Sequence, residues 1–142
     1  MAIASLALRT SQFTSGTTLN WSLLTSTLRC KILEFSFISQ GAATAQSIGL
    51  GRPATAGTNS GNVLFQRDDP NDAACITNGN TTQSVNGTAP TQYHRRWSCA
   101  ATVGVGVCWT FPRGMLVNTS SPIVCWNITT TVAADVNCVI DE

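Results

Sequence analysis

The sequence predicts a single all-β domain, an antiparallel β-sandwich of about eight strands. Three observations support this fold class. Several stretches alternate between apolar and polar residues with a period of two, and turn signals separate them. No stretch shows the 3.6-residue apolar period of an amphipathic helix. A jelly roll is favoured because it packs eight strands into two sheets, and an immunoglobulin-like sandwich is the alternative, although its Cys–Trp–Cys spacing is absent.

The clearest strand covers residues 29–39, with the sequence RCKILEFSFIS. At about 3.3 Å per residue it is long enough to cross a whole sheet, so the shorter strands are expected to pair with it or pack on it. The alternation places every second residue on one face, namely Lys31, Leu33, Phe35, Phe37 and Ser39. The opposite face is expected to carry Cys30, Ile32, Glu34, Ser36 and Ile38.

The remaining elements follow in chain order. In the first half, strands are expected at residues 3–8, 46–50 and 63–67, with loops at 10–18 and 54–62. Residues 21–28 fit either a short strand or an irregular segment that leads into the long strand 29–39. Residues 68–90 form a long polar connection with many turn signals that could contain a hairpin around 83–85. Strands follow at 92–100, 103–111, 115–117, 122–128 and 132–140.

Two features of these later strands bear on the surface. In the strand 92–100, alternation places Tyr93, Arg95, Trp97 and Cys99 on one face. The next strand carries Gly104 and Gly106, which indicate a bulge, and residues 112–114 are expected to form a turn.

Composition excludes several classes of protein. The chain has 142 residues, a net charge of +1 and only 11% charged residues, with no basic run, so a nucleic-acid surface is not expected. No apolar run reaches the length of a transmembrane helix, and the first ten residues lack the basic region of a signal peptide, so no membrane partner is expected. A surface rich in Ser, Thr and Asn loses little solvation when it is covered, which favours an assembly subunit.

The six cysteines have two interpretations. Five of them lie in apolar, strand-like stretches, which favours buried free thiols, and a disulfide framework is the alternative. There is no CxxC spacing and only one histidine, so neither a metal site nor a cofactor is expected. The cysteines are Cys30, Cys75, Cys99, Cys108, Cys125 and Cys138.

No enzyme is expected from the reactive residues. His94 has no Asp or Glu within about twenty residues on either side, so no catalytic triad is apparent. The acidic stretch 68–72, DDPND, does not match a calcium loop and is interpreted as a solvated turn, with a calcium site as the alternative.

The candidate binding residues are arginines, since a planar guanidinium can stack or pair within the domain or at a contact with another molecule, such as a subunit boundary. These residues are Arg52, Arg95, Arg96 and Arg113. The aromatic residues Trp97, Trp109 and Phe111 are interpreted as core, with a sugar-binding site as the alternative.

A set of segments resembles a group of small virion proteins of tailed bacteriophages. The segments are KILEFSF, SIGLGRPA, TAPTQYHRRW, TVGVGVCWTFPRGM and SPIVCWNITTTVAADVNCVIDE. The resemblance implies a jelly-roll subunit on the outer capsid surface, a decoration (cement) protein that does no chemistry, forms a homotrimer and contacts the major capsid protein. A head-fibre, tail or receptor-binding (carbohydrate-binding) module is the alternative.

Two further expectations accompany the resemblance. The chain departs from the pattern at Cys99, Cys108 and Cys125, where the group more usually has aliphatic residues, which is consistent with buried thiols. Residues 1–21 are a candidate arm that reaches a neighbouring subunit, and residues 22–142 are assigned to the sandwich.

Overall fold

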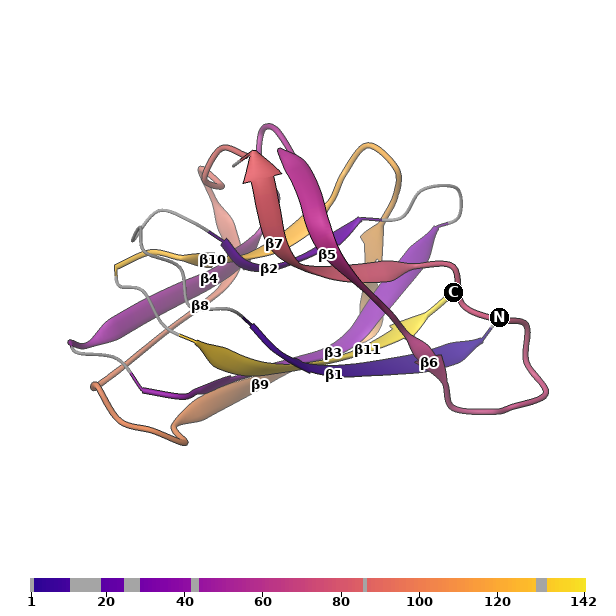
Figure 1. The fold of residues 1–142 in the computed structure, drawn as a ribbon, viewed down its shortest axis with the longest axis horizontal. Helices are drawn as coiled ribbons and strands as arrows, with labels where there is room; N and C mark the ends of the chain where they lie inside the picture. Colours follow the sequence, from indigo (N-terminus) through magenta and orange to yellow (C-terminus); the bar gives the residue numbers. More distant parts are fainter. Residues whose placement is uncertain (1, 11–18, 25–28, 42–43, 86, 130–132) are drawn as a thin grey trace.

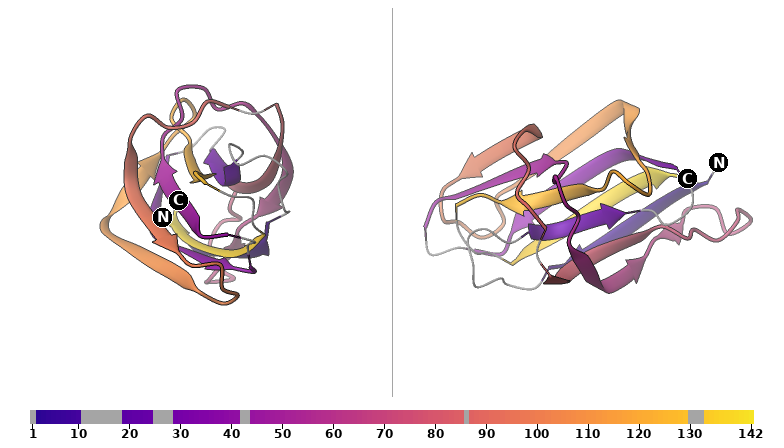
Figure 2. Two further views of the ribbon diagram at one scale, coloured as in Figure 1. Left: turned by 90° about the vertical axis from the view of Figure 1, so that its left-hand side faces the viewer. Right: turned by 90° about the horizontal axis from the view of Figure 1, so that it is seen from above.

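The computed structural model describes residues 2–10, 19–24, 29–41, 44–85, 87–129 and 133–142. These residues form two antiparallel sheets packed face to face, which confirms the predicted all-β sandwich (Figures 1 and 2). The strands are β1 (Ile3–Arg9), β2 (Leu19–Leu24), β3 (Cys30–Ser39), β4 (Gln46–Gly51), β5 (Thr58–Leu64), β6 (Gln66–Arg67), β7 (Asn78–Val85), β8 (Tyr93–Cys99), β9 (Gly106–Val117), β10 (Ile123–Asn127) and β11 (Ala134–Asp141).

The strand order is that of a jelly roll with an insertion. One sheet has the order β6-β1-β11-β3-β9 and the other β5-β7-β2-β10-β4-β8. Without β5, β6 and β7, the two sheets hold four strands each, and strands that follow one another in the chain lie in alternate sheets except at β4 and β8. The stretch between β4 and β8 is therefore an insertion that adds strands to both sheets.

The long strand β3 departs from simple alternation. Against β11, Glu34 lies opposite Val139 and Ile32 opposite Ile140, so Leu33 is the extra residue of a bulge in β3. Cys30 and Ile32 are consequently buried on the same face as Phe35 and Phe37. The predicted face was right for the second half of the strand and wrong for the first half, because one extra residue reverses the alternation.

The core is centred on an aromatic stack. The ring of Phe35 lies 5.0 Å from that of Trp21 and 6.1 Å from that of Trp109, so strands of both sheets meet there. The thiols of Cys30, Cys125 and Cys138 are also buried. The buried-thiol interpretation therefore holds for these three residues, whereas Cys75 and Cys99 are half-buried and Cys108 is exposed.

The insertion contains β7 and most of β5 where loops were expected, whereas the end of β5 and the whole of β6 fall within the expected strand at residues 63–67. Residues 58–64 form β5, and residues 78–85 within the long polar connection form β7, which pairs with both β5 and β2. Their Asn and Gly residues have low strand propensity and their sequences do not alternate between apolar and polar residues, so the pattern gave no signal. Pairing with neighbouring strands overrides that propensity.

One lateral side of the sandwich is closed by this insertion. β5 belongs to one sheet and β6 to the other, and Phe65 between them is 4% exposed and packs in the core. Figure 1 shows β5 descending from the upper sheet to β6. We call this the closed side: β5, Phe65, β6 and the turn at residues 68–72.

The N-terminal segment contributes to the sandwich. β1 pairs with β11 on one side and with β6 on the other, and Ala4 and Leu6 are buried. Residues 3–9 of the candidate arm therefore form an internal strand, while residues 11–18 lie outside the described residues.

The predicted turn at residues 112–114 is a bulge within a continuous strand. β9 runs from Gly106 to Val117, and its register against β3 jumps from Thr110 to Met115. Gly114 has a φ of 68°, a left-handed conformation that favours glycine. Gly104, with a φ of 81°, lies in the turn before β9 and not in a bulge of the strand.

Candidate functional site: an open aromatic and arginine side

The lateral side opposite the closed side is formed by β8 and β9, the last strands of their sheets. The rings of Trp97, Trp109 and Phe111 face the core there but are only half-buried. Trp97 packs 6.3 Å from Phe37, and Trp109 stacks on Phe35. We call this the open side, and it consists of Arg95, Trp97, Val107, Trp109, Phe111 and Arg113.

Bulges in the two edge strands orient the side chains of the open side. In β8 the register against β4 shifts so that Tyr93 lies opposite Gly51 and Arg95 opposite Leu50, which leaves His94 as the extra residue. Arg95 therefore shares a face with the buried Leu50. The prediction that Tyr93 lies on the face of Arg95 and Trp97 is wrong, because the bulge reverses the alternation between them.

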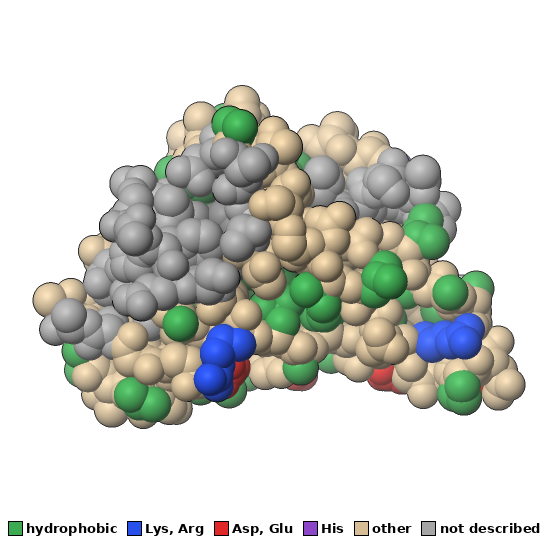
Figure 3. Space-filling model, viewed as in Figure 1, with side chains coloured by type: hydrophobic (Ala, Val, Ile, Leu, Met, Phe, Trp, Pro, Cys, Tyr) green, Lys and Arg blue, Asp and Glu red, His purple; other side chains and the backbone are tan. Residues whose placement is uncertain are grey.

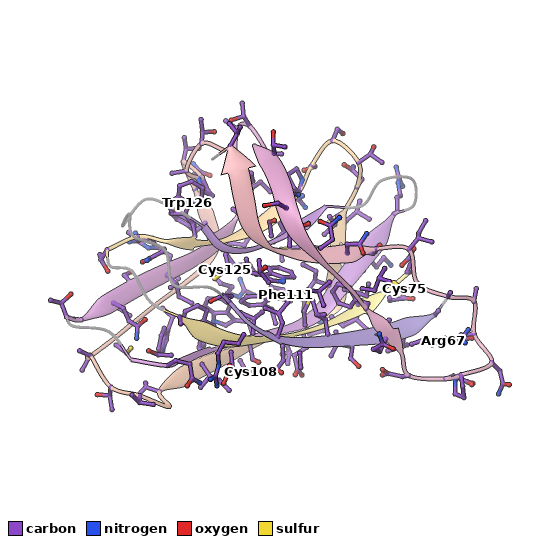
Figure 4. All side chains as sticks on the ribbon, in the orientation of Figure 1. Arg67, Cys75, Cys108, Phe111, Cys125 and Trp126 are labelled. Atoms are coloured by element: carbon purple, nitrogen blue, oxygen red, sulfur yellow. The ribbon has the colours of Figure 1, made fainter. Side chains whose placement is uncertain are left out.

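Arg95 and Arg113 come together beside Phe111. The guanidinium of Arg95 lies 5.4 Å from the centre of the Phe111 ring and donates a hydrogen bond to the carbonyl of His94. Both arginines line a shallow pocket of about 370 Å³ with Phe111, Pro112 and Gly114. Figure 4 shows Phe111 between the two sheets and Cys108 on the outer side of β9.

Arg52 is used within the chain. Its guanidinium donates to the carbonyl and hydroxyl oxygens of Ser121, at 2.9 and 2.7 Å, and to the carbonyl of Leu116. Partial burial lowers the pKa of Arg52. This residue therefore joins the end of β4 to β9 and to the turn before β10.

Arg96 lies on the opposite face of β8 from Arg95. Its guanidinium is 5.6 Å from the centre of the Tyr93 ring, and Tyr93 packs with Val124 and Trp126 on the outer face of the sheet. The Tyr93 ring also covers Gly49, where a Cβ atom would lie 2.3 Å from the ring. Of the four predicted arginines, the structure thus brings only Arg95 and Arg113 into one pocket.

The open side carries positive charge without a matching carboxylate. Partial burial and the charges of Arg52 and Arg95 lower the pKa of His94, which favours its neutral form. In the described part of the chain, the ion pair identified is that of Arg9 with Asp135, on β1 and β11. Arg95 and Arg113 therefore remain available to an acidic group from another molecule.

Four of the described thiols are held in their protonated form. Burial raises the pKa of Cys30 and of Cys75 to about 12 and raises those of Cys125 and Cys138, so these thiols are protonated at neutral pH. Across the described ranges, no three His, Cys, Asp or Glu side chains are grouped as metal ligands. Residues 68–72 form a turn that is exposed except at the half-buried Asp72, and in it Asp69 accepts a hydrogen bond from the backbone N–H of Asn71, in keeping with the solvated-turn interpretation.

Sequence reasoning identified the members of the open side but not their arrangement. It named both arginines and the three aromatic residues, yet it treated the arginines as separate contacts. The bulges at His94 and at residues 111–114 place the two arginines side by side, and Pro112 and Gly114, one residue apart, were the signal for the second bulge.

Comparisons with known proteins identify no relative. No protein-family model, curated protein or solved structure matches the chain. Among the described residues, no helix is long and apolar enough to cross a membrane.

Proposed function

We propose that this protein is a structural subunit of a virus particle, a capsid decoration (cement) protein of the kind found on tailed bacteriophages. The proposal rests on the resemblance of its sequence segments to such proteins and on the chemistry of its surface. Fold alone does not favour it over other roles, because jelly rolls serve many functions.

The observation that carries the proposal is the open side. Tryptophan and arginine are the residues most enriched among those that dominate binding energy at protein interfaces, and here they share one partly uncovered strip. The rest of the surface has few charges, and Figure 3 shows a face on which charged side chains are sparse among uncharged polar atoms. Such a molecule is suited to lasting association with other proteins.

The proposed action is mechanical. A decoration protein adds buried area across the boundaries between capsomers and so opposes the outward pressure of packed DNA. A homotrimer, the expected assembly, would link three modest contacts with the major capsid protein into one firm attachment by raising their effective concentration.

The test is binding to particles of the phage that encodes the chain. Purified protein is added to capsids that lack it, the capsids are sedimented, and bound copies are counted against the major capsid protein by mass spectrometry. The proposal predicts a fixed, high ratio on assembled capsids and none on unassembled capsid protein. A chain that does not sediment with capsids would contradict it.

A second candidate is a carbohydrate-binding module of a head fibre or tail. The half-buried rings of Trp97, Trp109 and Phe111 favour it, because sugars stack on aromatic faces. Against it, two of these rings are packed on Phe37 and Phe35. Glycan-array binding abolished by Trp97→Ala, together with a low copy number confined to fibres or tails, would favour this candidate.

A further inference from the structure

The closed side and the open side are complementary in chemistry. The sheet order places β6 and β9 at opposite edges of one sheet, and β5 and β8 at opposite edges of the other. Five strands at the usual spacing separate the two edges by roughly 20 Å, so one chain cannot bring them together. A second copy can, because its closed side can meet the open side of the first.

The closed side supplies negative charge. The turn that follows β6 carries Asp68, Asp69 and Asp72 against a single guanidinium, that of Arg67, which donates to the carbonyl of Asp72. Asp68 and Asp69 are exposed. This acidic turn matches the two guanidinium groups beside Phe111, since carboxylates are the usual bidentate partners of arginine.

The closed side also supplies apolar surface. Leu64 at the end of β5 is 57% exposed and Ile76, beyond the acidic turn, is 44% exposed. On the open side the complementary apolar surface is the half-buried row of Trp97, Trp109 and Phe111. Apolar contact flanked by charge pairs is the usual composition of an interface core and its rim.

We infer that the open side binds the closed side of a second copy of this chain, with the acidic turn 68–72 placed against Arg95 and Arg113. Because the two surfaces differ, the contact is heterologous, and repetition of it produces a closed ring if the rotation between copies closes. The inference rests on the proposed function in one respect, namely that the open side is an interface. It adds that the partner at this interface is a second copy of the chain.

Charge reversal tests the inference. The mass in solution is measured by light scattering for the wild type, for Arg95→Glu with Arg113→Glu, for Asp69→Lys with Asp72→Lys, and for one chain with all four changes. We expect an oligomer for the wild type, monomers for both double variants, and an oligomer again for the fourfold variant. Arg96→Glu is the matched control, since it makes the same charge change as Arg95→Glu on the other face of β8, and its oligomer should persist.

The outcomes separate this inference from the proposed function. Thermal melts verify that each variant is folded. A monomeric wild type, oligomers in both double variants, or a fourfold variant that stays monomeric would overturn the inference. A monomeric wild type that still sediments with capsids would leave the decoration proposal standing, whereas an oligomer that never attaches to capsids would contradict only that proposal.

Discussion

The two lateral sides of the sandwich are built differently. On the closed side the chain itself passes from one sheet to the other, and Phe65 at the crossing is 4% exposed. On the open side β8 and β9 end their sheets and leave Trp97, Trp109 and Phe111 half-buried. The difference shows that the insertion completes the core on one side only, and the partly exposed rings of the other side are the surface that we propose a second copy covers.

The largest expected difference in stability is between a Phe→Ala substitution on the closed side and the same substitution on the open side. Phe65→Ala should lower the free energy of unfolding by about 3–5 kcal/mol, because it leaves a cavity in a closed part of the core. Phe111→Ala should lower the free energy of unfolding of a dilute monomer by clearly less, since the ring is already partly exposed, but it should abolish association. Urea denaturation and light scattering measure the two effects, and equal losses of stability would remove the distinction between the sides.

A second pair compares thiols at different depths. Cys138→Ser should lower the free energy of unfolding by about 1–3 kcal/mol, because a hydroxyl without a partner is costly in an apolar site. Cys108→Ser, on the outer side of β9, should change stability by less than about 0.5 kcal/mol. Urea midpoints measured with reductant check both values, and a neutral Cys138→Ser would contradict the packing described here.

A third prediction concerns the bulge that positions Arg113. Gly114→Ala should cost about 1–2 kcal/mol, because the left-handed conformation disfavours a Cβ atom, which would also lie 2.7 Å from Lys31. The substitution should weaken association as well, since it disturbs the pocket beside Arg95. An oligomer of unchanged stability in this variant would show that the bulge does not position the contact.

The smallest effect is expected at the Arg9–Asp135 pair, away from both sides. Hydrogen bonding from Arg9 lowers the pKa of Asp135, so the ionised carboxylate is favoured in the folded state. Its contribution to stability is present above the ordinary carboxylate pKa of about 4 and is lost as the pH falls through the lowered value. With Asp135→Asn, the free energy of unfolding should fall slightly less than in the wild type as the pH is lowered below about 4, and the oligomer should be unchanged. A free energy of unfolding that falls more steeply with acid in the variant would contradict the stabilising role of the ionised carboxylate.

The strands that could be predicted from the sequence are mainly those in which apolar and polar residues alternate. The strands β1, β3 and β11 were expected, because their apolar residues recur with a period of two over much of their length. The strand β7 and residues 58–62 of β5 were not expected, since polar residues paired between neighbours give no such pattern. The bulges at Leu33 and His94 were also missed, so Cys30 and Ile32 in β3 and Tyr93 in β8 were placed on the wrong face.

The sequence allowed the residues of the open side to be predicted, but not their proximity to one another. Arg95, Arg113 and Phe111 were singled out by residue type, but their proximity depends on two bulges and on the packing of β8 against β9. The closed side gave no sequence signal, because the acidic turn 68–72 reads as an ordinary solvated loop and its importance comes from its place at the opposite edge of the sheet.

Amide hydrogen exchange tests the central claim most directly, with β9 compared to β11 over a range of protein concentrations. β11 lies inside its sheet, paired on both sides, so its protection should be high and independent of concentration. β9 pairs with β3 on one side, so its outward amides should exchange rapidly in dilute protein and become protected as copies associate. Exchange in β9 that stays equally fast at every concentration would contradict the claim that a second copy covers the open side.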